Sequence, residues 1–435
     1  MLARLGTITF ALAVLSATAC EKTTHENIDK WKTTEKGPGK LAKALSDGSL
    51  DPDLSAHAAA NMIQMGRDQD VRHTLESMPP ARRDKVIGAL APRLWKIARI
   101  EGEMELPKSS TQINAKDALI QLRKYADPNT KQQIDGYLID WYCVPSYDDA
   151  HGGGRAVLGT IRGDAAMRTV GPPAAKKMIE VANGVIAAPG QDKVKNRIGD
   201  ELLTALAATC APETVKYVLD VAKMDRGDTT LAERAMNALY KAYVNSGGEF
   251  DACPKDPLVP ELDEIVSIAK DDRVSGQAGD DAFSLISAVG PPACMSPLVG
   301  MIAHPHANPA FKFAATQAAL RCGGPPAIAD VVHALPEGPY SQRELLGGVA
   351  GEIAKLTPRD PTLAQVRQLL DDHRTLVRWV AVETLGAMKS VEDAPRLEAI
   401  KSADKLVGFW GGAGKPDPTL GQRAKEVAGQ LKGAK

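Results

Sequence analysis

Aromatic side chains are scarce in this 435-residue chain: Phe, Trp and Tyr make up 4% of it, although 44% of the residues are hydrophobic. A core of this composition packs mainly alanine and aliphatic side chains. The 38 glycines and 29 prolines predict short elements that are interrupted frequently. At this length the chain holds either two or three ordinary domains or one elongated array whose core grows along it.

An excess of charge of either sign is also missing. The chain carries 53 Lys and Arg residues against 54 Asp and Glu residues, and no long block has a single sign. Binding to nucleic acid depends on concentrated positive charge, which this sequence does not supply. We therefore expect no nucleic-acid partner, and no recruitment to a membrane by charge alone.

The motifs of common catalytic sites are absent as well. The sequence contains no C-x-x-C, H-E-x-x-H, G-x-S-x-G or G-K-[ST] and no calcium-loop spacing. The stretch HGGGRAV at 151–157 superficially resembles a phosphate or oxyanion loop, but no strand pattern precedes it. We therefore predict no catalytic residues, no cofactor and no enzymatic activity.

Two groups of residues could be proposed as metal ligands. One joins His304 and His306 to His333, and the other is Asp148, Asp149 and His151 beside three glycines. A metal needs three or four converging ligands, and neither group has a recognised spacing. We interpret them as a solvated turn and an acidic surface loop, and we predict no metal site. The acids at 371–372 precede a strong helical pattern, which favours helix capping over catalysis.

The first twenty residues, MLARLGTITFALAVLSATAC, have the organisation of an export signal. Arg4 precedes an apolar run that ends near Leu15, and small residues lead to Cys20. The run is shorter than the roughly 20 apolar residues that span a bilayer. We therefore predict a signal peptide at 1–19 rather than a retained transmembrane anchor.

Ala17-Thr18-Ala19 followed by Cys20 resembles the lipobox of bacterial lipoproteins, although the family usually has Leu where Ala17 stands. The resemblance implies that Cys20 becomes the acylated first residue of the mature chain, and that residues 20–36 form a lipid-anchored linker. Glu21, rather than Asp, follows the cysteine, which in that family implies delivery to the outer membrane. The alternative is a soluble periplasmic or secreted protein.

The tetrapeptide GPPA occurs three times, starting at Gly171, Gly290 and Gly324. Glycine adopts the left-handed conformation that ends a helix, and proline suits the first turn of the next one. Each GPP therefore marks the bend of a helical hairpin. Including similar signals without the double proline, we expect bends near 171, 211, 252, 291, 324 and 390.

An apolar stripe with a small second residue precedes several of these bends at spacing i, i+4, i+8 and i+11. Its members are Ala278, Ala282, Ile286 and Val289; Phe311, Ala315, Ala319 and Cys322; Val377, Ala381, Leu385 and Met388; and Leu54, Ala58, Met62 and Met65. Each hairpin is too short to bury such a stripe alone, so stability comes from stacking on its neighbours.

Helix–turn–helix units of this length, with V-R-x-x-A-x-x-x-L at Val377 to Leu385, resemble HEAT repeats, and the start of the chain looks like exported HEAT-repeat lipoproteins. The resemblance implies an all-α fold, a right-handed α-α superhelix of stacked hairpins. We expect N-terminal helical repeats at 37–160, HEAT-like repeats at 161–405, and a loop with a C-terminal capping helix at 406–435. Loops rich in Gly, Pro and acidic residues interrupt the period at 144–156, 245–260 and 408–421.

Five cysteines remain besides Cys20, and export permits disulfides. Stacking of adjacent hairpins brings Cys294 and Cys322 to one edge, and it places Cys210 and Cys253 in the same relation one repeat earlier. These are candidate disulfides, and Cys143 has no partner in this scheme. The alternative is that all five are small buried hydrophobic residues.

Phe409 and Trp410 lie in a Gly/Pro-rich loop, where large aromatic side chains often bind a partner. We favour the alternative that they fold back over the last hairpin. The leading functional hypothesis is a non-enzymatic, membrane-tethered scaffold that binds another envelope protein or an extended peptide. The alternative is an envelope enzyme, or an enzyme subunit, with its site on an insertion loop.

Overall fold

The computed structural model describes residues 22–98, 110–143, 163–188, 193–194, 198–224, 228–247, 251–304, 309–410 and 416–433. Helices and the turns between them make up these ranges, and the only β pairing among the described residues is an isolated bridge between Lys405 and Thr419. The all-α class and the stacked hairpins predicted from the sequence are confirmed. The chain divides into two compact units, residues 1–177 and 178–435.

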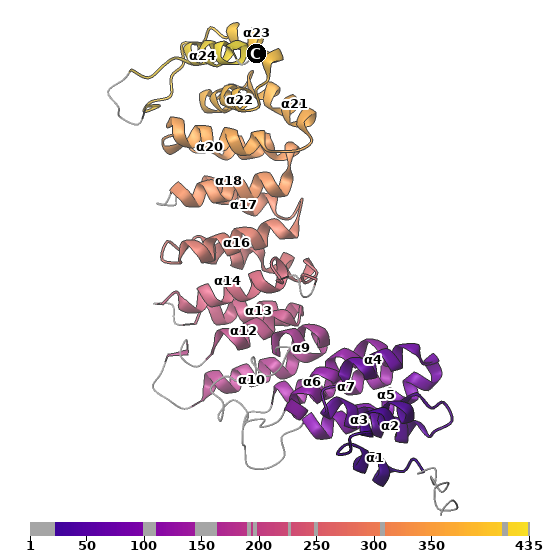
Figure 1. Ribbon diagram of the computed structural model, residues 1–435. Coiled ribbons are helices and arrows are strands. Elements are labelled where there is room, and N and C mark those ends of the chain that lie inside the picture. Colours follow the sequence, from indigo (N-terminus) through magenta and orange to yellow (C-terminus); the bar gives the residue numbers. More distant parts are fainter. Residues whose placement is uncertain are drawn as a thin grey trace, which may run out of the picture. The chain divides into compact units, whose positions relative to one another are not determined.

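The first unit contains helices that pack on near neighbours in the sequence (Figure 1). They are α1 (His25–Trp31), α2 (Gly37–Ser46), α3 (Pro52–Gln64), α4 (Asp68–Ser77), α5 (Pro80–Ala98), α6 (Ser110–Leu122), η1 (Arg123–Tyr125), α7 (Pro128–Tyr142), α9 (Gly163–Val170) and η3 (Pro172–Ala174). Helix α10 (Ala175–Ala187) begins in this unit and continues into the next.

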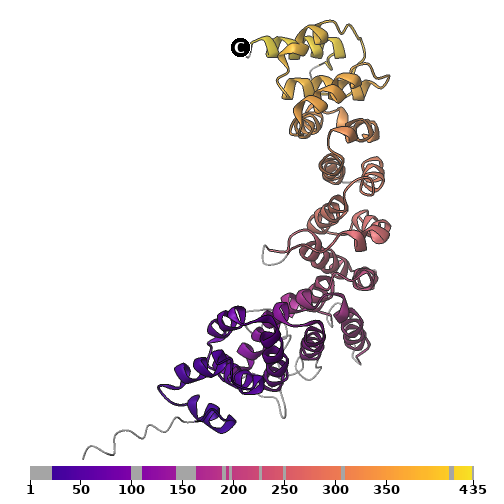
Figure 2. The same cartoon turned by 90° about the vertical axis from the view of Figure 1, so that its right-hand side faces the viewer.

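The second unit is a stack of two layers, which lie side by side in Figure 2. One layer consists of α12 (Asp200–Ala208), α14 (Thr230–Tyr243), α16 (Gly276–Val289), α18 (Pro309–Gly323), α20 (Arg343–Ala354), α22 (Thr375–Ala387) and α24 (Leu420–Gly433). The other consists of α13 (Pro212–Ala222), α15 (Leu262–Ala269), α17 (Met295–Ala303), α19 (Ile328–Ala334), α21 (Arg359–Leu369) and α23 (Ala394–Glu398). Short 3₁₀ turns join them: η4 (Asp256–Glu261), η5 (Pro325–Ala327), η6 (Pro339–Ser341) and η7 (Val391–Asp393).

The predicted apolar stripes are largely buried on helices that pack against one another in the first layer. Ala282 in α16, Ala315 in α18 and Ala381 in α22 are fully buried. Their small side chains let neighbouring helices approach closely, as the position of alanine in each stripe predicts. For the stripe near the start of the chain, the prediction is wrong for its last residue, Met65. Helix α3 stops at Gln64, and Met65 is 36% exposed.

The GPP bends have the backbone conformation that their residues predict. Gly171, Gly290 and Gly324 have φ angles of 78°, 82° and 61°, and each lies where one helix ends and the next turn begins. Two bends that lack this glycine use Cys210 and Lys389 at positive φ instead. The bends expected near 171, 211, 252, 291, 324 and 390 all separate successive helices.

Replacing Gly290 with alanine is expected to lower the free energy of unfolding by about 1–3 kcal/mol, because φ 82° and ψ 169° are essentially restricted to glycine. No atom lies within 4 Å of an added Cβ, so the cost is conformational rather than steric. Gly279→Ala is the matched control on the same helix and should stabilise by about 0.5–1 kcal/mol. Urea unfolding followed by circular dichroism measures both, and equal midpoints would contradict the assigned role of Gly290.

Arginines connect some of the repeats to the loop of the repeat before them. Arg82 of α5 donates to the backbone oxygens of Gly48 and Leu50, both at 3.0 Å. Arg234 of α14 donates to the oxygen of Ile198 at 3.1 Å in the second unit. These bonds satisfy carbonyl groups that a loop leaves without a partner.

Candidate functional site

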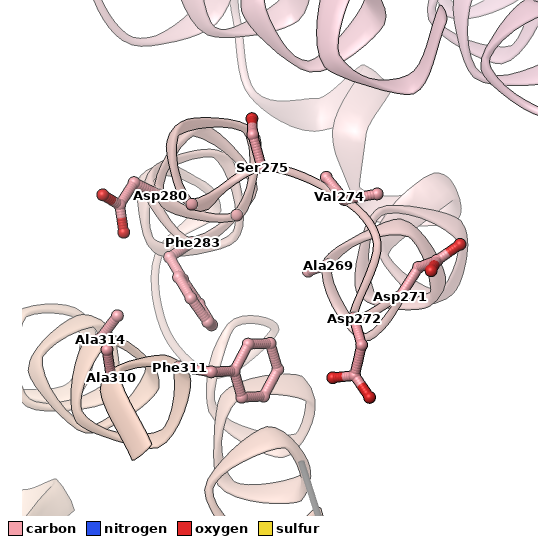
Figure 3. A pocket seen from close by; sticks show the side chains of 12 residues that line it. Ala269, Asp271, Asp272, Val274, Ser275, Asp280, Phe283, Ala310, Phe311 and Ala314 are labelled. Atoms are coloured by element: carbon pink, nitrogen blue, oxygen red, sulfur yellow. The ribbon is translucent and has the colours of Figure 1, made fainter. Parts of the chain in front are cut away.

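A hollow of about 320 Å³ opens between α15, α16 and α18 of the second unit (Figure 3). We call it the Phe–Asp hollow. Its lining consists of Ala269, Asp271, Asp272, Val274, Ser275, Gly276, Gly279, Asp280, Phe283, Ala310, Phe311 and Ala314. The small residues on α16 and α18 leave the space that the hollow occupies.

Two phenylalanine rings lie together at the hollow. Phe283 comes from α16 and Phe311 from α18, and their ring centres are 5.2 Å apart at an interplanar angle of 59°. This tilted arrangement is a favourable one for aromatic pairs. The side chains are only 5% and 7% exposed, so packing holds the rings in place beside the opening.

Carboxylates surround these rings. Asp271 is bound by Arg273, whose Nε lies 2.8 Å from Oδ1, and these hydrogen bonds lower the pKa of the carboxyl. Asp280 on α16 makes no hydrogen bond or ion pair with the described residues. Burial, with a further contribution from the charge of Asp281, raises the pKa of Asp280.

Asp281 adds a second unusual carboxylate on the same helix. It is 2% exposed; Gln277 Nε2 donates to its Oδ1 at 3.0 Å, and its Oδ2 has no hydrogen-bond partner. A cation placed near Asp280 would relieve the repulsion between the two neighbouring acids.

The local sequence builds the entrance to the hollow. Asp271 Oδ1 accepts the backbone N–H of Arg273 at 3.0 Å and closes the turn after α15. Ser275 then caps α16, because its Oγ accepts the N–H of Ala278 at 3.4 Å. The turn and the cap together place Asp272 and Asp280 on opposite sides of the opening (Figure 3).

A second hollow, of about 530 Å³, continues from the first and shares Asp280, Phe283 and Ala314 with it. Gln317 and Arg321 of α18 contribute to its lining. The two hollows form one depression along α16 and α18, with acidic residues at one end and an arginine at the other.

We favour folding back of Phe409 and Trp410 over partner binding, and Phe409 does pack against α22. Phe409 is 1% exposed, and its ring centre lies 4.8 Å from that of Trp379 in α22. Trp410 is half-buried, packs edge-on against Phe409 at 4.9 Å, and has the Arg343 guanidinium 5.3 Å from its ring centre. Phe409 is therefore a core residue. Although it lies in a loop, its ring is buried against Trp379 of α22.

Both candidate disulfides are present in the structure. Cys210 is bonded to Cys253 and Cys294 to Cys322, with Cα atoms 5.5 Å and 6.7 Å apart. Each bridge joins neighbouring hairpins of the second unit. Cys143 is buried and takes part in neither bridge. Cys20, the predicted lipidation site, lies outside the described residues.

Among the described residues, no three His, Cys, Asp or Glu side chains converge on a common point, and neither proposed metal-ligand group lies wholly within these residues. His333 Nε2 lies 2.8 Å from Asp372 Oδ2 instead. Asp372 Oδ1 also accepts the backbone N–H of Arg374 at 2.8 Å in the turn before α22. Arg374 is the N-cap residue and no side chain caps the helix, so the capping expected of the acids at 371–372 is not formed. His306 lies outside the described residues, as do the members of the second group, Asp148, Asp149 and His151.

Searches for relatives found no matching family model and no matching curated protein. A solved structure of human deoxyhypusine hydroxylase in complex with glycerol is similar to this chain, at 16% identity over 80% of this chain and 98% of that one, with a TM-score of 0.25.

The protein in that structure is, by its name, an enzyme, and our expectation that this chain is not an enzyme is corrected accordingly. The absence of known catalytic sequence motifs does not exclude catalysis, because a stack of repeats brings together side chains that are distant in the sequence. So low a TM-score carries no argument for a particular activity of this chain. Among the described residues, no helix is both long enough and apolar enough to cross a membrane.

Proposed function

We propose that this protein is a HEAT-like scaffold of the bacterial cell envelope, exported by residues 1–19 and anchored in the outer membrane through lipid on Cys20. The leader, the small residues before Cys20 and Glu21 after it support this proposal. The stack of hairpins supplies a long surface for a partner, and an anchor raises the local concentration of that surface at the membrane.

The Phe–Asp hollow is the surface through which the scaffold binds. The observation that carries this assignment is that Asp280, whose carboxylate has no hydrogen bond or ion pair among the described residues, lines the same hollow as the packed rings of Phe283 and Phe311. No lysine or arginine belongs to the described lining of the hollow. The partner is an envelope protein, or an extended peptide, that presents a lysine or arginine side chain.

The chemistry of the hollow suits such a side chain. Aromatic rings attract a cation by about 0.5–2 kcal/mol, depending on how fully the pair is desolvated. The aliphatic stem of lysine or arginine would cover the Ala310 and Ala314 surface while its charge reaches Asp280. An approaching cation would also favour the ionised form of Asp280 and lower its raised pKa.

Reversing the charge of Asp280 should weaken partner binding by about tenfold or more, because attraction becomes repulsion at the rim. The partner is first captured with the anchored full-length protein from membrane extracts and is then titrated against Asp280→Lys. Asp263→Lys is the matched control, since Asp263 is an exposed helical aspartate on α15 that does not line the hollow. Equal loss in both variants would show a general charge effect and contradict the assignment.

The anchor is tested separately by the mass of the mature N-terminus in the membrane fraction. The proposal predicts that the chain begins at Cys20 and carries a diacylglyceryl group and an acyl group. Cys20→Ala should shift the protein from the membrane to the aqueous fraction. An unmodified Cys20 would contradict the anchor and leave binding at the hollow unaffected.

A further inference from the structure

The depression along α16 and α18 is lined by equivalent faces of two successive repeats. In its larger hollow, lining residues recur at i, i+3 and i+7 on both helices. They are Asp280, Phe283 and Ser287 on α16, and Ala314, Gln317 and Arg321 on α18. The two sets are offset by 34 positions, as are the GPPA bends that begin at Gly290 and Gly324. The helices therefore present the same face, but with different side chains on it.

The two helices run in the same direction. The Phe283 ring packs on the Phe311 ring, and one turn further along α16, Ser287 Oγ donates to the Ala318 oxygen at 3.3 Å. Residue numbers rise together in these two contacts. Asp280 therefore lies near one end of the larger hollow, close to the Phe–Asp hollow that it also lines (Figure 3), and Arg321 lies toward the other end.

The two ends carry opposite charges. Asp280 and Arg321 are both exposed, and neither makes a hydrogen bond or ion pair within the part of the chain that the structure describes. Burial opposes ionisation of Glu352 in α20, yet hydrogen bonds from Lys355 and Gln317 lower its pKa. The charge of Arg321 adds less than these bonds do, and Lys355 Nζ donates to that carboxylate at 2.6 Å. Asp280 and Arg321 are thus both accessible to a ligand of complementary charge.

The distance between these charges sets the spacing of the groups that a ligand must carry. Asp280 shares both hollows with Ala314, and Arg321 lies seven positions after Ala314. At the rise of an α-helix this separation is about 10 Å. On an extended peptide, side chains at i and i+2 lie about 7 Å apart and those at i and i+4 about 13 Å apart, on the same side. The long side chain of Arg321 reaches a carboxylate at either spacing, whereas residues one or three positions apart point to opposite sides.

The floor between the charges is apolar and narrow. Phe283 and Ala318 are each 5% exposed there, and Ala288 and Val244 complete its apolar lining. The bond from Ser287 to Ala318 shows that α16 and α18 are in direct contact at this point. A further helix, with a diameter of about 10–12 Å, cannot enter between them, so an extended chain fits the depression better.

We infer that the depression binds an extended peptide segment that carries a basic and an acidic side chain two or four positions apart. The inference rests on the proposed function, because it keeps the basic side chain at Asp280 and adds a carboxylate at Arg321. A guanidinium binds a carboxylate through two parallel hydrogen bonds. A uniformly basic segment is excluded, since Arg321 repels its second charge. Both directions of the peptide chain satisfy the two charges.

Selection from a phage-displayed library on the purified full-length protein tests the inference. The probe is a library of random peptides of about twelve residues, long enough to hold both charges in an extended or a helical conformation. Enriched peptides should carry Lys or Arg and Asp or Glu at a spacing of two or four. Enrichment at spacings of one or three, or the absence of any enriched pair, would overturn the inference. A spacing of seven would indicate a helical ligand, since seven helical residues also span about 10 Å, and would overturn it as well.

Charge reversal assigns each preference to its residue. Selection on Arg321→Glu should replace the acidic residue of the enriched pair with a second basic one. Binding of a peptide selected on the wild type, measured by fluorescence anisotropy, should weaken about fivefold or more in this variant. Lys425→Glu is the control and should behave like the wild type, since Lys425 is an exposed lysine on α24 that lines neither hollow.

The same selections separate this inference from the proposed function. If the basic preference depends on Asp280, but no acidic residue is enriched or Arg321→Glu binds like the wild type, the inference fails and the proposed function stands. If Asp280→Lys retains the wild-type preference for a basic residue, both fail.

Discussion

Replacing Arg423 with alanine is expected to lower the stability of the last hairpins by about 3–5 kcal/mol, because the change leaves a buried carboxylate without a partner. Arg423 of α24 is 5% exposed, and it donates to both oxygens of Glu383 in α22 at 2.6 Å and 2.9 Å. The hydrogen bonds to Glu383 are the main reason that the pKa of Arg423 is raised, and the guanidinium stays charged. Urea unfolding of the full-length protein measures the loss.

A double variant shows that the loss comes from the unpaired charge rather than from the missing attraction. Arg423→Met combined with Glu383→Gln removes both charges and keeps similar volumes. Such replacements of buried ion pairs are often neutral or stabilising, so most of the stability should return. If the double variant is as unstable as Arg423→Ala, the position of Arg423 matters through packing against Phe409 instead.

Loss of the Cys294–Cys322 bridge is expected to lower stability by about 3–4 kcal/mol, because the bridge closes a loop with a sequence separation of 28 residues. The bond restricts the unfolded chain, and its removal in Cys294→Ala with Cys322→Ala releases that restriction. Thermal unfolding with and without reductant measures the effect. The double variant should lose less stability on reduction than the wild type, since only the Cys210–Cys253 bridge then remains to be broken.

Cys143→Ala is the control for this experiment, because Cys143 belongs to neither bridge and its replacement should leave the response to reductant unchanged. Peptide mapping without reduction identifies the bridges directly. A peptide that links Cys143 to Cys294 or Cys322 would contradict the pairing and the boundaries of the repeats.

The bends and the buried stripes could be predicted from the sequence because they depend on local physics. At Gly290 and Gly324 a positive φ is inexpensive only for glycine, and a proline can follow only at the start of a helix. The Cys294–Cys322 pairing could also be anticipated, since hairpins of constant length bring bends to one edge at a regular interval.

The Phe–Asp hollow could not be predicted, because its existence depends on the separation between two helices rather than on either helix. Phe311 is recognisable in the sequence as part of an apolar stripe, but nothing there indicates that Phe283 lies 5.2 Å away from it. The burial of Phe409 depends in the same way on Trp379, which comes from another repeat. His25 and His57, whose Nδ1 atoms lie 2.8 Å apart, are likewise 32 positions apart and share no motif.

The arginine contacts between successive repeats have a consequence for how the chain folds. Arg82 and Gly48 are 34 residues apart, Arg234 and Ile198 are 36 apart, and Arg423 and Glu383 are 40 apart. Closing a loop of that size costs about 3 kcal/mol of chain entropy beyond a constant term, and the logarithmic dependence makes this cost nearly the same at every step. A newly formed hairpin therefore needs only the hairpin before it as a template, so folding can begin at any neighbouring pair and extend in both directions. A whole repeat could be duplicated or deleted in evolution without changing what the remaining hairpins require of one another.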